Sequence, residues 1–342
     1  MSAKQILKTL VPSSAREKLR RTQQLLRDRN SEQIQYRRFI RWISMGNSTD
    51  APRIETRLEF DVHRLEKGLS HQNLRLGFGK SVLREIGMRM TWLEKADVDY
   101  MHNSLYLEAL SALHEYQTRH EEAGFDLTPI KALLPLHIWD GALSYQADDE
   151  HHAGSFVMQA SCKSDNFDKG FVDLAEGRYS VREYSDEPVA QETLDAVYAA
   201  AMKTPSVCNR QASRIHQISD PTVIEKALKI QGGFTGYKIP PVLLFVTSDI
   251  RAFMNGDERN EPFVDGGLFS MSLLYALEAY GLAACPLNAM FTLSTDAATR
   301  KLLDIPEWEL PVMYIAVGHF PESVPVCASI RKKPEEILTI IK

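Results

Sequence analysis

Residues 178–182 carry the first side chains that could do chemistry: two arginines around a tyrosine, a serine and a valine. Arg178, Ser180 and Arg182 alternate along a stretch that we predict to be extended, so they point to the same side. Two guanidiniums with a hydroxyl between them could hold a dianionic phosphate through charge-assisted, bidentate hydrogen bonds. A solvated basic turn explains the same short pattern, and it is the plainer interpretation of these residues alone.

A second polar segment, residues 205–211, follows a predicted helix at 191–203 and precedes a predicted strand. Its backbone amides and the Asn209 carboxamide suit a planar, uracil-like ring edge on which hydrogen-bond donors and acceptors alternate. An ordinary helix-to-strand connection would have the same composition.

Two further segments lie closer to the C-terminus. Gly281 ends a helix, and the small residues that follow it lead to Pro286, so the backbone there could approach a flat ring closely. Arg331 and Lys332 follow the last predicted strand and could add cations to a phosphate site. A helix–glycine–strand connection and a solvated charged loop are the structural alternatives.

The elements that must position these residues change in character along the chain. Residues 1–122 predict helices, because Gly and Pro are sparse and straight-chain residues and Ala dominate. The polar stretch 145–165 predicts a linker between a helical extension at 1–150 and a second domain at 166–342. Within that extension, we predict a helix over 52–67 that Gly68 caps.

In the second domain, helices alternate with short apolar or β-branched runs, which predicts an α+β or α/β sandwich. The expected strands are 214–219, 242–246 and 312–317. Asp265-Gly266-Gly267 opens the longest helix, 265–280, which is apolar almost all round. Such a helix is predicted to be buried in a core or in an interface.

Composition and charge limit the classes of function that we expect for this chain. The chain has 342 residues and a net charge of −5, which gives no global reason to expect nucleic acid. The four cysteines are widely spaced and include no Cys-x-x-Cys pair, so we expect no metal site, no disulfide scaffold and a reducing, cytoplasmic location. We also expect no secretory signal and no membrane span.

The N-terminal arm, residues 1–50, has eleven Lys and Arg against four Asp and Glu, a net +7 that leaves −12 for the remainder. An apolar stripe that includes Phe39, Ile40 and Trp42 runs along it. We favour packing of this stripe on the acidic body. Contact of the arm with an anionic membrane is the alternative.

Taken in order, the segments from 178 to 333 resemble the nitroreductase family of FMN enzymes over about residues 170–342. The resemblance implies a three-layer α/β/α sandwich preceded by an all-helical extension. In that family the Arg-x-Ser-x-Arg/Lys element, here 178–182 with Tyr179 inside it, grips FMN. Arg178 would bind the phosphate, Ser180 the ribityl chain or phosphate, and Arg182 the N1–C2 edge of the ring.

The same resemblance implies a homodimer in which the 205–209 loop reaches FMN from the partner subunit. The loop residues that match are Pro205, Ser206, Val207 and Asn209. The segment over the ring N5 would be Pro286, Leu287, Asn288 and Ala289, and the basic pair at the phosphate would be Arg331 and Lys332. The chain departs from the family at Ala212-Ser213, where Pro-Trp is common, and at Asn288-Ala289, where Glu-Gly is common.

The front half resembles, in His63–Leu69 and Arg75–Gly79, the N-terminal region of long nitroreductase-like proteins that accompany bacterial surface-polysaccharide clusters. We expect a structural corner that docks on the second domain. The alternative is a lid in which His63, Arg64 and Lys67 bind an anionic substrate.

The resemblance implies an FMN-dependent oxidoreductase that passes hydride or electrons from NAD(P)H to a small-molecule acceptor in a ping-pong cycle. The sequence has no Gly-x-Gly-x-x-Gly fingerprint, so a nicotinamide would be a transient substrate. No side chain stands out as a catalytic acid or base, although Tyr237, His216 and Cys285 are possible proton donors. The alternative is a non-catalytic flavin-binding partner protein in envelope polysaccharide assembly.

Overall fold

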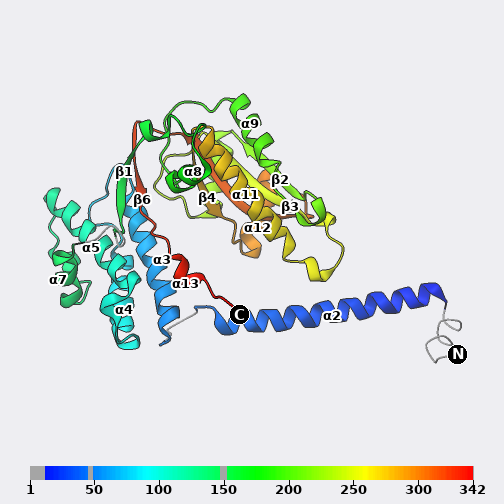
Figure 1. The fold of residues 1–342 in the computed structure, drawn as a ribbon, viewed down its shortest axis with the longest axis horizontal. Helices are drawn as coiled ribbons and strands as arrows, with labels where there is room; N and C mark the ends of the chain where they lie inside the picture. Colours follow the sequence, from blue (N-terminus) through cyan, green and yellow to red (C-terminus); the bar gives the residue numbers. More distant parts are fainter. Residues whose placement is uncertain (1–11, 45–48, 147–151, 342) are drawn as a thin grey trace.

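The computed structural model describes residues 12–44, 49–146 and 152–341 (Figure 1). A helical extension comes first, and a domain built on a four-stranded sheet follows it. The predicted linker 145–165 is partly wrong, because it contains strand β1 (Ser155–Gln159), while residues 147–151 lie outside the described residues. β1 pairs antiparallel with β6 (Ser323–Cys327), so the stretch is tied to the C-terminal end of the chain.

The helical extension is built from α3 (Ala51–Leu69), α4 (Lys80–Ala96), α5 (Ser104–Glu122) and α7 (Leu136–Ser144). Apolar residues spaced three and four apart on α3, among them Leu58 and Leu65, are fully buried in a core of their own. The short helix α6 (Thr128–Lys131) links α5 to α7.

Gly68 does not cap α3 as the sequence predicted. The helix continues to Leu69, and Gly68 faces the ring of Phe78. A Cβ atom at Gly68 would lie 1.9 Å from that ring, so only glycine lets the end of the helix pack there. The glycine therefore serves close packing and not helix termination.

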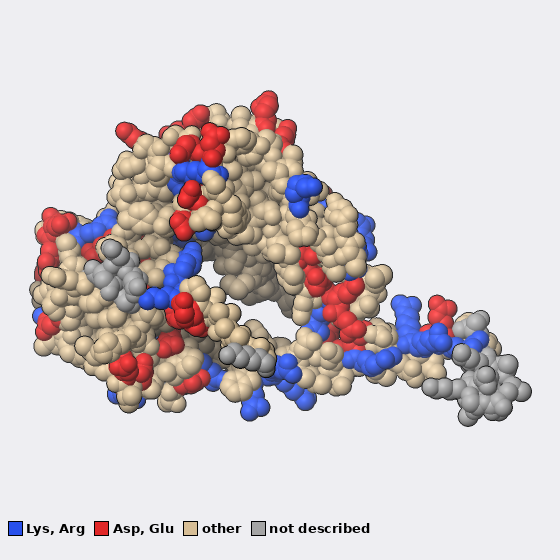
Figure 2. All heavy atoms as spheres, viewed as in Figure 1, with Lys and Arg blue, Asp and Glu red and all other residues tan. Residues whose placement is uncertain are grey.

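Helix α2 (Ser13–Trp42) projects from the rest of the molecule, and in the space-filling view an opening separates much of it from the body (Figures 1 and 2). It touches the sheet domain near 256–259 through polar groups: Arg259 contacts Glu32 and Gln35. The expectation that its apolar stripe packs on the body is wrong in this structure, since Phe39 and Trp42 are 62% and 63% exposed. The contact with the body uses the polar side of the helix, which leaves the stripe uncovered.

The sheet domain has three layers around antiparallel strands in the order β2-β3-β5-β4. These strands are β2 (Ser213–Ile218), β3 (Val242–Asp249), β4 (Leu282–Asn288) and β5 (Glu309–His319). The three strands predicted at 214–219, 242–246 and 312–317 are β2, β3 and β5. Every residue of β3 is buried, as expected for a strand covered on both faces.

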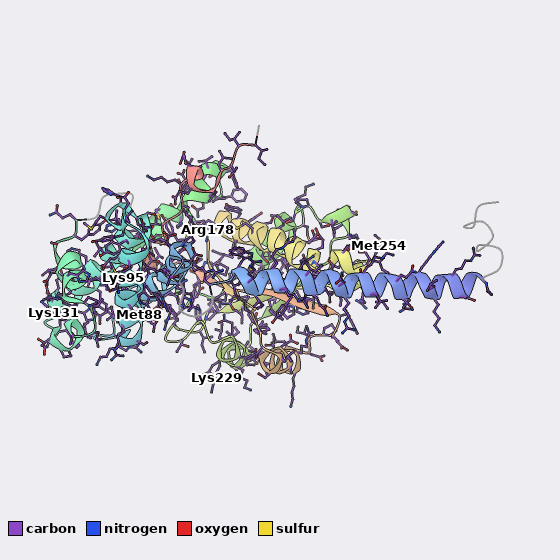
Figure 3. All side chains as sticks on the ribbon, turned by 90° about the horizontal axis from the view of Figure 1, so that it is seen from below. Met88, Lys95, Lys131, Arg178, Lys229 and Met254 are labelled. Carbon is purple, nitrogen blue, oxygen red and sulfur yellow. The ribbon has the colours of Figure 1, made fainter. Side chains whose placement is uncertain are left out.

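Helices cover the two faces of the sheet in pairs (Figure 3). Helices α9 (Gln191–Ala201) and α11 (Glu261–Ala279) share a core with one face, and α10 (Pro221–Gln231) and α12 (Leu293–Leu303) pack on the other. A Cβ atom at Gly266 would come within 2.6 Å of Val312, so this glycine lets α11 approach β5. None of the helices in the described part of the chain is long and apolar enough to cross a membrane.

Candidate functional site

The 178–182 segment runs along the outer edge of β4, directly after α8 (Phe171–Gly177). The backbone N–H of Val181 donates to the carbonyl of Ala284 at 3.0 Å, and the Val181 side chain is fully buried in the core. Because side chains alternate along an extended chain, Ser180 and Arg182 face away from that core. The segment thus lies beside β4, with Ser180 and Arg182 on the side opposite Val181.

A buried ion pair fixes the start of this segment. The Lys163 ammonium lies 2.6 Å from a Glu278 carboxylate oxygen on α11 and also donates to the carbonyl of Gly177, the residue before Arg178. Asn166 donates to the same carboxylate oxygen at 3.0 Å. The carboxylate and the ammonium therefore satisfy one another while holding α8 against α11.

Arg182 is a buried cation, with its side chain only 8% exposed. Its Nη1 lies 3.3 Å from the sulfur of Cys327 and 3.4 Å from the carbonyl of Ser180. No carboxylate pairs with it among the residues that the structure describes. A buried guanidinium without a counter-charge is costly, which makes this position a candidate for an anionic ligand.

The end of α3 lies against Arg182. The Ser70 hydroxyl is 3.5 Å from the Cys327 sulfur, the same atom that Arg182 contacts. The Tyr237 hydroxyl donates to the carbonyl of Lys67 at 2.7 Å, and its ring stacks on His71 with 3.9 Å between centroids. The helical extension therefore forms one wall of the candidate site.

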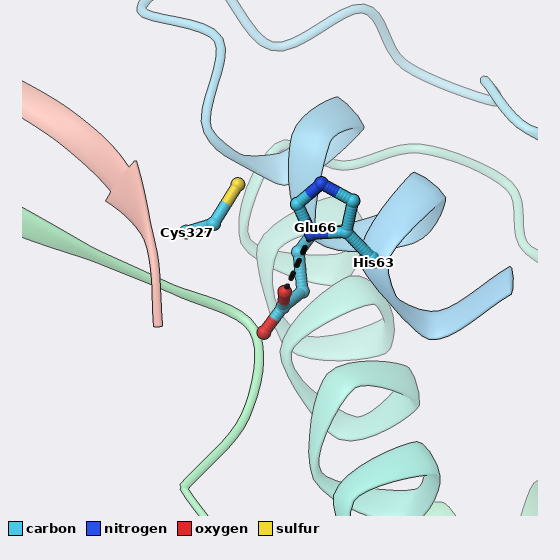
Figure 4. Close-up of side chains that lie close together, drawn as sticks. All are labelled: His63, Glu66 and Cys327. Atoms are coloured by element: carbon cyan, nitrogen blue, oxygen red, sulfur yellow. Dashed lines mark ion pairs between the residues drawn. The ribbon is translucent and has the colours of Figure 1, made fainter. Parts of the chain in front are cut away.

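Glu66 joins the two parts of the chain at this wall. Its carboxylate accepts from the backbone N–H of Gly154 at 3.1 Å and from that of Ser329 at 3.2 Å. With His63 and Cys327 it forms a group whose potential ligand atoms lie within 4.8 Å of one another (Figure 4). Because the carboxylate is already engaged by backbone donors, and Arg182 lies on the sulfur, we assign this group a structural role, in line with the expected corner.

An open cleft of about 950 Å³ lies beside Arg178 and is also lined by Tyr179, Arg331 and Tyr275. Its walls come from β1, α8, α11 and residues 328–331, and Figure 3 labels Arg178 at this place. Two of the expected phosphate ligands, Arg178 and Arg331, therefore share one cleft. Lys332 lines a different cavity and faces Glu108 of α5, so its charge is directed toward carboxylates of the extension.

The 286–289 segment ends β4, the strand that the 178–182 segment flanks. Leu287 is buried, Asn288 is exposed, and the carbonyl of Asn288 accepts from the Gln231 side chain at 3.1 Å. Pro286 and Ala289 are half-buried. These residues share an edge of the sheet with the arginines.

The 205–211 loop lies at the opposite edge, before β2, so a single chain does not bring it to the arginines. Asp265 holds it by accepting from the Val207 N–H at 3.0 Å, and Cys208, Asn209 and Gln211 adopt left-handed backbone angles with φ of 49°, 56° and 50°. Such angles are uncommon outside glycine and indicate a loop of defined shape. Pro205 and Asn209 are exposed there, and Ser206 is half-buried.

None of the three possible proton donors, Tyr237, Cys285 and His216, is placed as a catalytic acid or base at this site. Burial raises the pKa of Tyr237 to about 12, and burial also raises the pKa of the Cys285 thiol. The His216 ring lies 2.7 Å from Glu309, on edge strand β2 and away from Arg182. Ser70 and Cys327 lie beside Arg182, although no sequence pattern pointed to either residue.

Comparison with known protein families matches residues within the sheet domain. Residues 175–233 and 232–319 match the family model described as the nitroreductase family. A protein of Bacillus subtilis named FMN reductase [NAD(P)H] is 27% identical over 155 residues, which is 41% of this chain and 61% of that relative's length. The chain therefore spans less than two thirds of this curated relative.

Solved structures are also similar to part of this chain. The FMN-dependent nitroreductase from Clostridium difficile R20291 is 19% identical, with a TM-score of 0.40, and covers 44% of this chain and 88% of its own. The B. megaterium NfrA2 structure is 23% identical, with a TM-score of 0.39, and covers 43% of this chain and 65% of its own.

Proposed function

We propose that the chain is an FMN-dependent oxidoreductase that transfers electrons from NAD(P)H to a small-molecule acceptor, because residues 175–319 match the nitroreductase family model. The observation that carries the proposal is that Arg178 and Arg331 line one open cleft, while Arg182, four residues after Arg178, is buried against Cys327 without a carboxylate partner among the described residues. The name of the Bacillus subtilis relative, an FMN reductase that uses NAD(P)H, supports the same cofactor and reductant.

The residues at this edge fit FMN. Arg178 and Arg331 would hold the phosphate in the open cleft, where charge-assisted bonds to a dianion are strong. Ser180 would hold the ribityl chain or phosphate, and Arg182 would face the N1–C2 edge of the ring. When bound, the flavin would accept two electrons from a nicotinamide and deliver them to a second substrate.

The protein's own contribution is binding, orientation and electrostatics. Arg182 is buried, so its field acts through a medium of low polarity and favours negative charge on the adjacent ring edge. The backbone of 286–289 would cover the ring. The 205–209 loop would come from the partner subunit, which agrees with its position at the far edge of the sheet.

Replacement of the phosphate ligand tests the proposal. Arg178→Ala removes one charge-assisted phosphate contact worth about 1.5–3 kcal/mol, so we expect FMN affinity to fall about ten- to hundredfold. Isothermal titration of the apoprotein with FMN measures the change. The control is Lys301→Ala, which removes an exposed cation on α12, on the opposite face of the sheet from α11. Unchanged FMN affinity in Arg178→Ala would show that the site is assigned wrongly.

A further inference from the structure

The His63–Leu69 segment docks on the sheet domain, and it also brings a cation, Lys67, near the candidate site. The Lys67 ammonium donates to the carbonyl of Gly233 at 2.9 Å, while the Lys67 carbonyl accepts from Tyr237. Both ends of the residue are thus held by the 232–241 loop of the sheet domain. Burial lowers the pKa of Lys67, and the charge of Arg182 lowers it further.

The end of α3 that carries Lys67 lies next to Arg182, and the two cations are within electrostatic reach of each other. Ser70, one turn beyond Lys67, contacts the Cys327 sulfur at 3.5 Å, and Arg182 contacts that atom at 3.3 Å. Burial raises the pKa of the Cys327 thiol, so the sulfur is neutral and offers no counter-charge at neutral pH. Ser70, the residue that follows α3, and the Arg182 guanidinium therefore meet at one neutral group.

The nearby carboxylates are engaged elsewhere. Glu66 accepts from the backbone of Gly154 and Ser329, and Glu183 lies 3.8 Å from His71. Within the described ranges, no ion pair joins a carboxylate to Lys67 or to Arg182. Two neighbouring cations repel each other in a buried setting, and an anion between them would offset that repulsion.

We propose that Lys67, supplied by the helical extension, is a second cation of the flavin site that acts with Arg182 to stabilise the reduced ring. The inference rests on the proposed function. Uptake of two electrons and one proton leaves the reduced ring with one negative charge, which the oxidised ring lacks. A nearby cation therefore binds the reduced form more tightly and raises the two-electron potential.

The test compares the bound-flavin potential in full-length variants by reductive titration against a reference dye. Lys67→Met should weaken binding of reduced relative to oxidised FMN about tenfold, which lowers the two-electron potential by about 30 mV. Lys67→Arg retains the charge and should stay near wild type. The control Lys95→Met removes an exposed lysine at the end of α4, within the helical extension, and should leave the potential unchanged.

The outcomes separate the two proposals. If wild type binds FMN but Lys67→Met keeps its potential, the role of Lys67 is wrong and the proposed function stands. If Lys67→Met and Lys67→Arg lower the potential equally, the effect is structural and the inference also fails. Wild-type protein that does not bind FMN would overturn both. Thermal melts of each variant show whether a shift accompanies loss of folding.

Discussion

At the scale of single residues, Arg182 and Lys67 are at least partly buried and form no ion pair with a carboxylate of the described residues. Among the described residues Arg182 is buried without a carboxylate partner, and the Lys67 ammonium donates to the backbone carbonyl of Gly233. The arginines could be predicted from the sequence, because their spacing within five residues is a local pattern. Lys67 could be predicted only as part of an alternative substrate lid, because its place near Arg182 arises from docking of α3 against residues about 115 and 165 positions further along the chain.

Glu108 of α5 provides a residue-scale test of burial. Burial, and then the charges of Glu66 and Glu59, raise its pKa from 4.5 to about 7. The folded chain therefore keeps a proton that the unfolded chain loses, and stability falls as pH rises from about 4.5 to about 7. Glu108→Gln removes this dependence, so the variant should be more stable than wild type above pH 7 and equal to it below pH 4.5.

Urea unfolding of wild type and Glu108→Gln across this pH range measures the difference. The control is Glu121→Gln, which changes an exposed residue of the same helix. A stability gain for Glu108→Gln that is the same at every pH would contradict a shifted carboxyl pKa.

At the scale of elements, the order of helices and strands in the sheet domain could be predicted, because each has its own periodicity and end signals. The predicted helix 265–280 is α11 (Glu261–Ala279), for example. β1 escaped prediction because its partner, β6, lies more than 160 residues further along the chain, and because the short apolar run at 156–158 stands within a stretch that is otherwise largely polar. The exposure of the α2 stripe also depends on tertiary placement, which its amphipathic pattern does not encode.

The buried Lys163–Glu278 pair tests how α8 is held to α11. Glu278→Leu leaves a buried ammonium unpaired, and we expect a loss of about 3–5 kcal/mol in the free energy of unfolding. The double variant Lys163→Met, Glu278→Leu should recover much of that loss, since neither charge remains. Urea denaturation measures both. Equal destabilisation by the single and double variants would argue that packing, and not the stranded charge, is responsible.

At the scale of the whole molecule, the candidate site is divided between two edges of one sheet. Phe263, Val264 and Leu268 of α11 are about half exposed, and the 205–211 loop lies near the start of this helix through Asp265. A second copy covering α11 would bury these side chains and could bring its loop to the arginines. A homodimer with FMN at the subunit boundary is therefore our prediction for the assembled protein.

Leu268→Glu tests this arrangement, because the Leu268 side chain is 48% exposed in one chain and a charge there should not disturb the fold. We expect sedimentation to show a dimer for wild type and a monomer for Leu268→Glu, with FMN affinity reduced in the monomer. The control is Leu293→Glu at the exposed start of α12, which should remain dimeric. A folded wild-type monomer that binds FMN would defeat the shared-site account. A Leu268→Glu monomer that binds FMN as tightly as the wild-type protein would defeat it too.

The central claim is that this chain binds FMN and reduces it with a nicotinamide. Purified protein loaded with FMN and mixed with NADH or NADPH without oxygen tests it most directly, with the visible absorbance of the flavin as the readout. The account predicts that the yellow colour bleaches and returns on addition of an electron acceptor. Colour that persists with both nicotinamides would contradict the account and favour a non-catalytic flavin-binding protein.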